Sequence, residues 1–134
     1  REDHTLGNIS LLMEYQQMGA EVVMLTDYGF FIPATGDKVF AGFPRQQVSV
    51  FNFGAAQLRS EGLKYPIYDF HSLWQGTLNE VEHSSFRITA KGSYLVYCTY
   101  EPRPKKTPLR FIQNVKEFYF KRKCVWTQTA LRFP

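Results

Sequence analysis

Three histidines lie one or two residues from an acidic residue, which is an arrangement used in general acid–base catalysis. The pairs are Asp3 with His4, Asp69 with His71, and Glu82 with His83. None of them belongs to a nucleophile elbow, a phosphate-binding loop or an H-E-x-x-H zinc motif. Because an acidic neighbour is common for any histidine, we expect all three at the surface or at a helix start. The sequence therefore predicts a protein that is not an enzyme and has no catalytic residues.

The two cysteines, Cys98 and Cys124, form no C-x-x-C motif and lie in apolar, strand-like sequence. Such cysteines are usually reduced and buried, so we expect two unpaired thiols, no metal site and no cofactor. The chain has no signal peptide and no apolar run approaching the roughly 20 residues that span a bilayer. These features predict an intracellular protein of the nucleus, cytosol or mitochondrion that is not secreted and does not enter a membrane.

Positive charge is concentrated at the end of the chain. Residues 101–134 have nine Lys or Arg and two Glu, whereas residues 1–100 have seven bases and ten acids. Aromatic residues alternate with the charges over residues 118–126 (FYFKRKCVW). Aromatic rings stack on bases and cations contact phosphates, so the segment favours single-stranded nucleic acid, RNA or DNA, as a partner. A protein partner within a nucleoprotein complex is also expected.

The candidate nucleic-acid contacts are exposed aromatics and basic residues. They are Tyr28, Phe30, Phe43, Arg45, Lys105, Lys106, Arg110, Lys121, Arg122 and Lys123. The alternative is structural: the rings could fill the core, and the charges could keep an aggregation-prone strand soluble. Because Lys121, Arg122 and Lys123 are consecutive, at least one of them projects from each side of a strand.

Helical periodicity is confined to residues 6–18, which end before Gly19, with residues 54–62 as a candidate second short helix. Strands are expected over most of residues 21–53 and 73–128, where aromatic and β-branched runs are separated by Gly, Pro and Asp. Both faces of residues 93–100 (SYLVYCTY) are largely apolar, which is typical of a central strand.

Many short strands at intervals of about 8 to 12 residues, with one or two helices, favour a mainly β fold. We expect an OB-like small β-barrel with one N-terminal helix. The chain is long enough for one domain, residues 1–134. Its parts would be an N-terminal helix (1–18), a β-barrel body (19–100) and a basic, aromatic-rich β segment (101–134).

Four stretches resemble the S1 type of OB fold. They are residues 19–33 (GAEVVMLTDYGFFIP), 42–45 (GFPR), 76–81 (GTLNEV) and 86–89 (FRIT). They are similar to that family's opening strand, its aspartate-aromatic-glycine turn and its later strands. The resemblance covers residues 19–91 and implies nucleic-acid binding. The aromatic positions that it implies as RNA contacts are Tyr28, Phe30, Phe31, Phe40 and Phe43.

Residues 2–8 (EDHTLGN) resemble the motif that opens the dimerisation helix in small RNA polymerase assembly subunits of the L and eleventh-subunit type. The same residues also suit an ordinary helix start, since Thr5 could accept a backbone N–H and Asp3 favours the positive end of the helix dipole. The resemblance implies an alternative function, in which the domain is a protein-protein interaction or assembly module.

Overall fold

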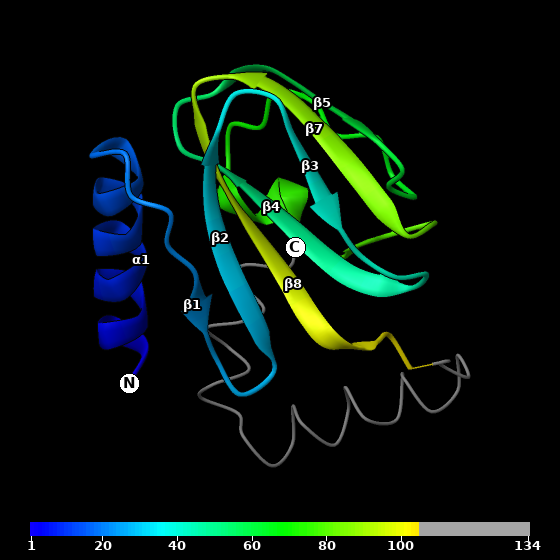
Figure 1. Cartoon of the computed structure of the whole chain (residues 1–134), viewed down its shortest axis with the longest axis horizontal. Helices are drawn as coiled ribbons and strands as arrows, with labels where there is room; N and C mark the ends of the chain where they lie inside the picture. Colours follow the sequence, from blue (N-terminus) through cyan, green and yellow to red (C-terminus); the bar gives the residue numbers. More distant parts are fainter. Residues whose placement is uncertain (105–134) are drawn as a thin grey trace. The chain divides into compact units, whose positions relative to one another are not determined.

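The computed structural model describes residues 1–104, which form one N-terminal helix and two antiparallel sheets (Figure 1). The elements in chain order are α1 (Glu2–Gln17), β1 (Met24–Leu25), β2 (Gly29–Thr35), β3 (Lys38–Ala41), β4 (Gln46–Asn52), β5 (Ala56–Glu61), the 3-10 helix η1 (Leu73–Gly76), β6 (Asn79–Glu80), β7 (Ser85–Lys91) and β8 (Ser93–Pro102). This architecture confirms the expected mainly β fold with an N-terminal helix.

The larger sheet has the strand order β1-β2-β8-β4-β6, so β8 lies in its middle, as the sequence predicts. Residues on the two sides of β8 enter different clusters. Val96 and Cys98 are buried in the main core, whereas Leu95 packs in a second cluster on the other face. This strand is apolar on both faces because it is covered on both faces.

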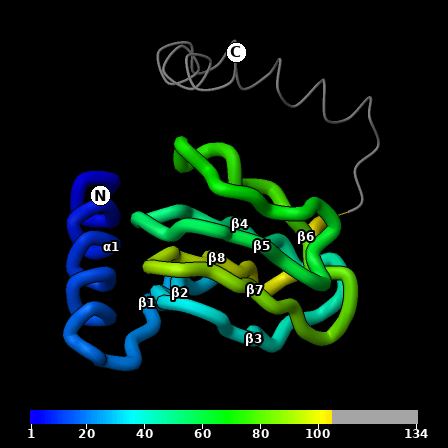
Figure 2. The backbone as a smooth tube through the Cα atoms, turned by 90° about the horizontal axis from the view of Figure 1, so that it is seen from above, coloured from blue at the N-terminus to red at the C-terminus, as the bar shows by residue number. Residues whose placement is uncertain are grey.

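The smaller sheet has the order β3-β7-β5, and Figure 2 traces its backbone together with that of the larger sheet. The two sheets share the main core. Leu58, Phe86 and Ile88 supply buried side chains from this sheet. The alternation in β7 is regular: Phe86 and Ile88 are buried, while Arg87 between them is exposed. The sheets remain separate and do not close into one barrel, so the fold is a sandwich of two sheets.

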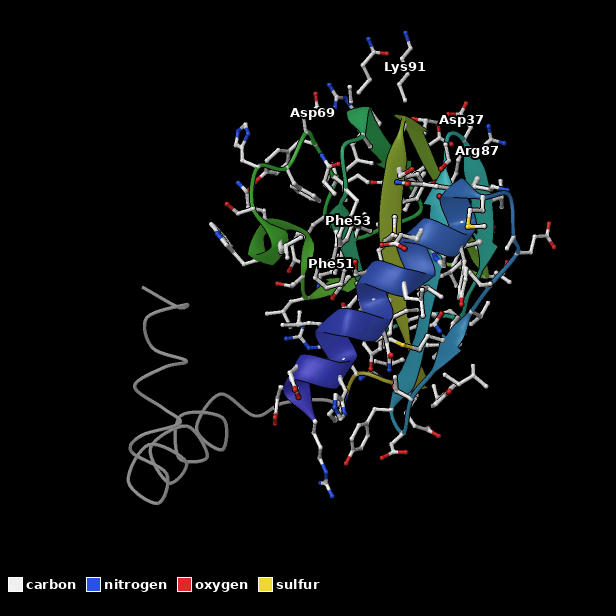
Figure 3. The ribbon with its side chains drawn as sticks, turned by 90° about the vertical axis from the view of Figure 1, so that its left-hand side faces the viewer. Asp37, Phe51, Phe53, Asp69, Arg87 and Lys91 are labelled. Atoms are coloured by element: carbon white, nitrogen blue, oxygen red, sulfur yellow. The ribbon has the colours of Figure 1, made fainter. Side chains whose placement is uncertain are left out.

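Helix α1 covers the outer face of the larger sheet, and Figure 3 looks onto the helix where it lies across the strands. Leu12 and Met13 are buried there with Leu95. The helix begins at Glu2, four residues earlier than the sequence pattern indicated. Its residue Thr5 donates its hydroxyl to the carbonyl oxygen of Arg1 (3.1 Å), and therefore does not act as an N-cap acceptor.

Residues 54–62 are not a second helix, because they contain strand β5. Strand β5 pairs with β7, and the register of this pairing shifts at a bulge between Ala56 and Arg59. Gln57 has a positive φ of 55° in this bulge. Pairing with β7 and burial of Leu58 outweigh the local helical preference, which is weak by comparison with tertiary packing.

Several expectations concern residues 105–134, which lie outside the described residues. They are the strands after residue 104, the pairing state of Cys124 and the position of the basic segment. The division of residues 1–134 into three parts of one domain therefore stays a prediction. Among residues 1–104, no helix is long and apolar enough to cross a membrane.

Candidate functional site

A cleft of about 410 Å³ lies between two irregular segments of the chain. Its walls come from residues 65–68, Phe70, residues 75–79 and Arg103, and this set is called the cleft from here on. The volume is within the range of small-molecule sites, roughly 300–1,000 Å³. Both segments follow β5, the edge strand of the small sheet. Most of their residues lie outside regular strands, so hydrogen bonds between strands do not hold them in place.

The first wall is fixed by hydrogen bonds from side chains to the backbone. The Asn79 carboxamide accepts from the Tyr65 N–H (3.0 Å) and donates to the Tyr65 carbonyl (2.7 Å). The Ser60 hydroxyl accepts from the Ile67 N–H (3.1 Å). The Asp69 carboxylate accepts from the Leu58 N–H at the β5 bulge (2.7 Å). These bonds satisfy backbone groups that have no strand partner.

The second wall lies directly on the edge of β4. Gly76 is buried there, and a Cβ on it would lie 1.9 Å from the Val50 carbonyl oxygen, so no other residue fits without movement. The Gln75 carboxamide oxygen accepts from the N–H groups of His71 (2.7 Å) and Ser72 (2.9 Å). Leu78 has a positive φ of 64°, an uncommon conformation for a side chain of its size.

Aromatic rings provide most of the cleft's recognition chemistry. Tyr65 and Tyr68 are about half exposed, at 54% and 51%, so their rings are accessible to a ligand. The buried Phe70 ring supports Tyr68 edge-on, with 4.7 Å between ring centroids. Such rings bind flat heterocycles by stacking and attract cations to their faces. The polar side chains of Gln75 and Thr77 supply hydrogen-bonding groups beside them.

Beside the cleft, but not lining it, is Glu80, whose side chain is 15% exposed. Its carboxylate lies 3.2 Å from the Lys64 ammonium and 3.8 Å from the Arg103 guanidinium. The hydrogen bond to Glu80 raises the pKa of Lys64. Next to the first wall, the hydrogen bond from the Leu58 N–H lowers the pKa of the Asp69 carboxyl, and Arg59 adds to the effect. Both groups are therefore charged at neutral pH.

The histidines and the described cysteine, which the sequence predicts to have no catalytic role, do not line the cleft. His4, His71 and His83 are all exposed, which confirms their expected surface or helix-start positions. Burial raises the pKa of the Cys98 thiol to about 12, so this thiol is unreactive at neutral pH. Within residues 1–104, no three His, Cys, Asp or Glu side chains are close enough to hold a metal ion.

The predicted nucleic-acid contacts that the structure describes lie near the end of β8. Tyr28 is exposed and its carbonyl accepts from the Tyr100 N–H (3.1 Å). Phe30 is half-buried against the core, and Phe43 is half-buried in the turn before β4. Arg45 is exposed at a positive φ of 67°. Lys105, Lys106, Arg110, Lys121, Arg122 and Lys123 lie outside the described residues. A binding role for any of the ten stays a prediction.

Only indirect signals of the cleft are visible in the sequence. Gly62 and Pro66 indicate a turn on one wall, and Gly76 marks a point of close backbone approach on the other. Asn79 is the residue that joins the walls, yet an asparagine within residues 73–81 reads as an ordinary strand or turn residue. The sequence pattern predicted a strand there, whereas the chain forms η1 and then the two-residue strand β6.

Two further hollows exist among residues 1–104. One, of about 590 Å³, lies between residues 16–23 and strands β2 and β3. The other, of about 550 Å³, is on the outer face of the small sheet and includes Asp37, Arg59 and Lys91. Neither offers an exposed aromatic ring with a strained backbone beside it. The cleft is therefore the better candidate for recognition of a small molecule.

The comparison with protein families gives one match, to the thiamin pyrophosphokinase, substrate-binding domain. It covers residues 29–97, which is 69 of the 134 residues and contains every cleft residue except Arg103. No curated protein matches the sequence. The matched range includes both sheets and the two cleft walls, so the similarity applies to the whole sandwich.

Solved thiamin pyrophosphokinases share the fold. The enzyme from Bacillus subtilis is 21% identical with a TM-score of 0.64, and the alignment covers 74% of this chain and 50% of that one. The enzyme from Geobacillus thermodenitrificans is 22% identical with a TM-score of 0.60, covering 75% and 50%. The enzyme from Candida albicans is 15% identical with a TM-score of 0.64, covering 75% and 41%. The chain thus spans about half the length of these structures or less.

These findings overturn the OB-fold and polymerase-subunit resemblances. The S1-like stretches are divided between the two sheets: residues 29–33 belong to β2 in the large sheet and residues 86–89 to β7 in the small one. Phe40, an expected RNA contact, is buried and stacks on Phe86 with 5.1 Å between centroids. The polymerase-like motif at residues 2–8 forms the start of α1, which packs on the large sheet.

The expected function is also wrong. The family match indicates the substrate-binding domain of an enzyme, in place of a non-enzymatic protein that binds single-stranded nucleic acid. The prediction of single-stranded nucleic acid as the partner is therefore wrong as well. The alternative, an OB-like or polymerase-like protein-interaction module, has no support in the comparisons either. The many aromatic residues are compatible with nucleic-acid binding and with small-molecule binding, because rings that could stack on bases also fill sandwich cores and line small-molecule clefts.

Proposed function

Because the chain belongs to the family of thiamin pyrophosphokinase substrate-binding domains, we propose that it binds thiamin in the cleft. It would be the substrate-binding part of a thiamin pyrophosphokinase, an enzyme that transfers a pyrophosphoryl group to the hydroxyl of thiamin. The chain covers about half of the related enzymes' length, so the complete activity is part of this proposal.

The exposed rings of Tyr65 and Tyr68 are the observation that carries the proposal. Thiamin has a flat aminopyrimidine ring joined to a positively charged thiazolium ring. A tyrosine face suits each ring: stacking suits the pyrimidine, and cation–π attraction suits the thiazolium. The pyrimidine also has ring-nitrogen acceptors, which match the amide nitrogen of Gln75, and an amino donor, which matches the hydroxyl oxygen of Thr77. The Gln75 oxygen and the Thr77 O–H are already bonded to backbone groups, so the Gln75 nitrogen and the Thr77 oxygen are the atoms that remain for the ligand.

The contribution of this domain to the reaction would be binding and orientation. The thiamin hydroxyl oxygen loses its proton to solvent and forms a bond to the phosphorus of the transferred pyrophosphoryl group. The bond from that phosphorus to the donor's remaining phosphate breaks, and this phosphate leaves with the donor. Holding the hydroxyl at a fixed angle to the donor removes much of the entropic barrier of such a two-substrate reaction. A rigid cleft serves this purpose, and the hydrogen bonds of Asn79 to Tyr65 make one wall rigid.

An intracellular location remains part of the proposal. The supporting feature is Cys98, which is buried in the core and surrounded by apolar strands. The choice among nucleus, cytosol and mitochondrion stays a prediction.

The proposal is tested by titrating the protein with thiamin in a calorimeter. We expect saturable binding that weakens about five- to thirty-fold in Tyr65→Leu and in Tyr68→Leu, since a ring face contributes about 1–2 kcal/mol to a cation. Tyr28→Leu is the matched control, because Tyr28 is an exposed tyrosine that does not line the cleft. Equal affinity in all three variants would place the thiamin site elsewhere.

A further inference from the structure

Arg103 is the one charged side chain among the described residues that line the cleft. Its backbone is anchored on both sides: its N–H donates to the Arg45 carbonyl (2.9 Å), and the Arg45 guanidinium donates to the Arg103 carbonyl. The Arg103 side chain is 28% exposed, so it is held in place but still accessible to a ligand. A fixed positive charge therefore belongs to the cleft.

The acidic partner of Arg103 does not cancel this charge. Glu80 is its ion-pair partner at 3.8 Å, but the same carboxylate also has a hydrogen bond from Lys64 at 3.2 Å. Two cations thus share one carboxylate. A guanidinium has five N–H donors arranged for planar oxyanions, and the 3.8 Å ion pair with Glu80 leaves most of them available.

The charge has opposite consequences for the two forms of the proposed ligand. Thiamin is a cation, so Arg103 repels it weakly. The pyrophosphate ester of thiamin has the same two rings together with a strongly negative group, which a guanidinium binds through charge-assisted hydrogen bonds. The electrostatics of the cleft therefore suit the pyrophosphorylated molecule better than the alcohol.

We infer that Arg103 binds the phosphate groups of the pyrophosphorylated ligand, and that the cleft consequently binds this reaction product more tightly than it binds thiamin. The inference rests on the proposed function, since it takes the rings of both ligands to occupy the tyrosine-lined cleft. Its consequence for the enzyme is product inhibition: the ester competes with thiamin for the cleft, and release of the ester becomes a slow step.

The test compares three probes in calorimetric titrations of the full chain: thiamin, thiamin diphosphate and inorganic pyrophosphate. We expect the unmodified protein to bind thiamin diphosphate about tenfold more tightly than thiamin, as one to two charge-assisted hydrogen bonds allow. Arg103→Gln should remove this preference by weakening the diphosphate and leaving thiamin unchanged or slightly tighter. Arg103→Lys should retain part of the preference, because it keeps the charge and loses the planar fork.

Lys91→Gln is the control for a general loss of positive charge, because Lys91 is an exposed base at the end of β7 that does not line the cleft (Figure 3). It should keep the full preference. Thermal unfolding of each variant shows whether the sandwich is intact.

Each outcome separates the two proposals. Equal affinity for thiamin and thiamin diphosphate, or a preference that survives in Arg103→Gln, overturns the inference and leaves thiamin binding in place. If neither thiamin compound binds, the proposed function fails. Binding of inorganic pyrophosphate that depends on Arg103 would then support the phosphate site alone, and no such binding would overturn it as well.

Discussion

The interior of the sandwich and the walls of the cleft are built in different ways. Between the sheets, apolar side chains alternate along regular strands, as Phe86 and Ile88 do in β7. In the cleft, the backbone is irregular and single polar side chains fix it, chief among them Asn79. The interior is a sum of many similar contacts, whereas the shape of the cleft depends on a few atoms.

This difference explains why the two regions should respond differently to substitution. Dispersion and hydrophobic burial are distributed over many atoms, so the interior contributes to global stability. A buried amide such as Asn79, which is 5% exposed, is matched to particular backbone groups and leaves them unpaired when it is removed. Substitutions in the cleft should therefore change its local shape and its ligand binding more than the loss of buried apolar area alone would predict.

The largest effect is expected in the interior, from Phe86→Ala. Phe86 is 2% exposed, and its ring stacks on Phe40. Truncating such a ring costs about 3–5 kcal/mol of unfolding free energy, so both regions should unfold together at lower denaturant concentration. Arg87→Ala, the exposed neighbour in the same strand, should change stability by no more than about 0.5 kcal/mol. A loss below about 1 kcal/mol for Phe86→Ala would show that the two-sheet core is not the main source of stability.

A smaller but more local effect is expected from Asn79→Ala. The change leaves both the N–H and the carbonyl of Tyr65 without their partner, which costs about 2–3 kcal/mol. Hydrogen exchange should accelerate most in residues 64–80, with little change in β8. Asn8→Ala, on the exposed side of α1, is the control. Uniform acceleration over the sheets would mean that the walls and the interior are one cooperative unit.

The smallest effects come from two identical changes in opposite settings. Gly76→Ala would place a methyl group 1.9 Å from the Val50 carbonyl oxygen, and overpacking of this kind costs about 1–3 kcal/mol. Gly7→Ala meets no atom within 4 Å in α1 and should stabilise the protein by about 0.5–1 kcal/mol, as alanine does in a helix. Thermal unfolding measures the loss of stability in the first variant and the gain in the second. If Gly76→Ala does not lower the unfolding temperature, η1 does not pack tightly on β4.

The regular elements could be predicted from the sequence because their signals are periodic. The alternation in residues 93–100 indicated a central strand, and the structure places β8 there. Which strands pair with each other is harder to predict from the sequence. Strand β2 pairs with β8, where Gly29 lies opposite Thr99, and no local pattern specifies a pairing across 70 residues. The S1-like resemblance rested on local turn and aromatic signals, which different β folds share.

The cleft could not be predicted for a related reason. Asn79 and Tyr65 lie apart in the sequence, and the hydrogen bonds that join them have no periodicity. The bulge at Gln57 and the positive φ of Leu78 are equally specific to the folded chain. The sequence instead drew attention to the basic segment after residue 104, because charge and aromatic content are visible without knowledge of contacts.

The central claim is that the cleft is the thiamin site, and amide chemical-shift mapping tests it most directly. Thiamin is added stepwise to nitrogen-15-labelled protein, and the shift of each backbone amide is followed. We predict that the largest saturating changes fall on Tyr65, Ile67, Tyr68, residues 75–79 and Arg103. The largest changes at residues 16–23, or at Asp37, Arg59 and Lys91 on the small sheet, would contradict the account and assign the site to another hollow.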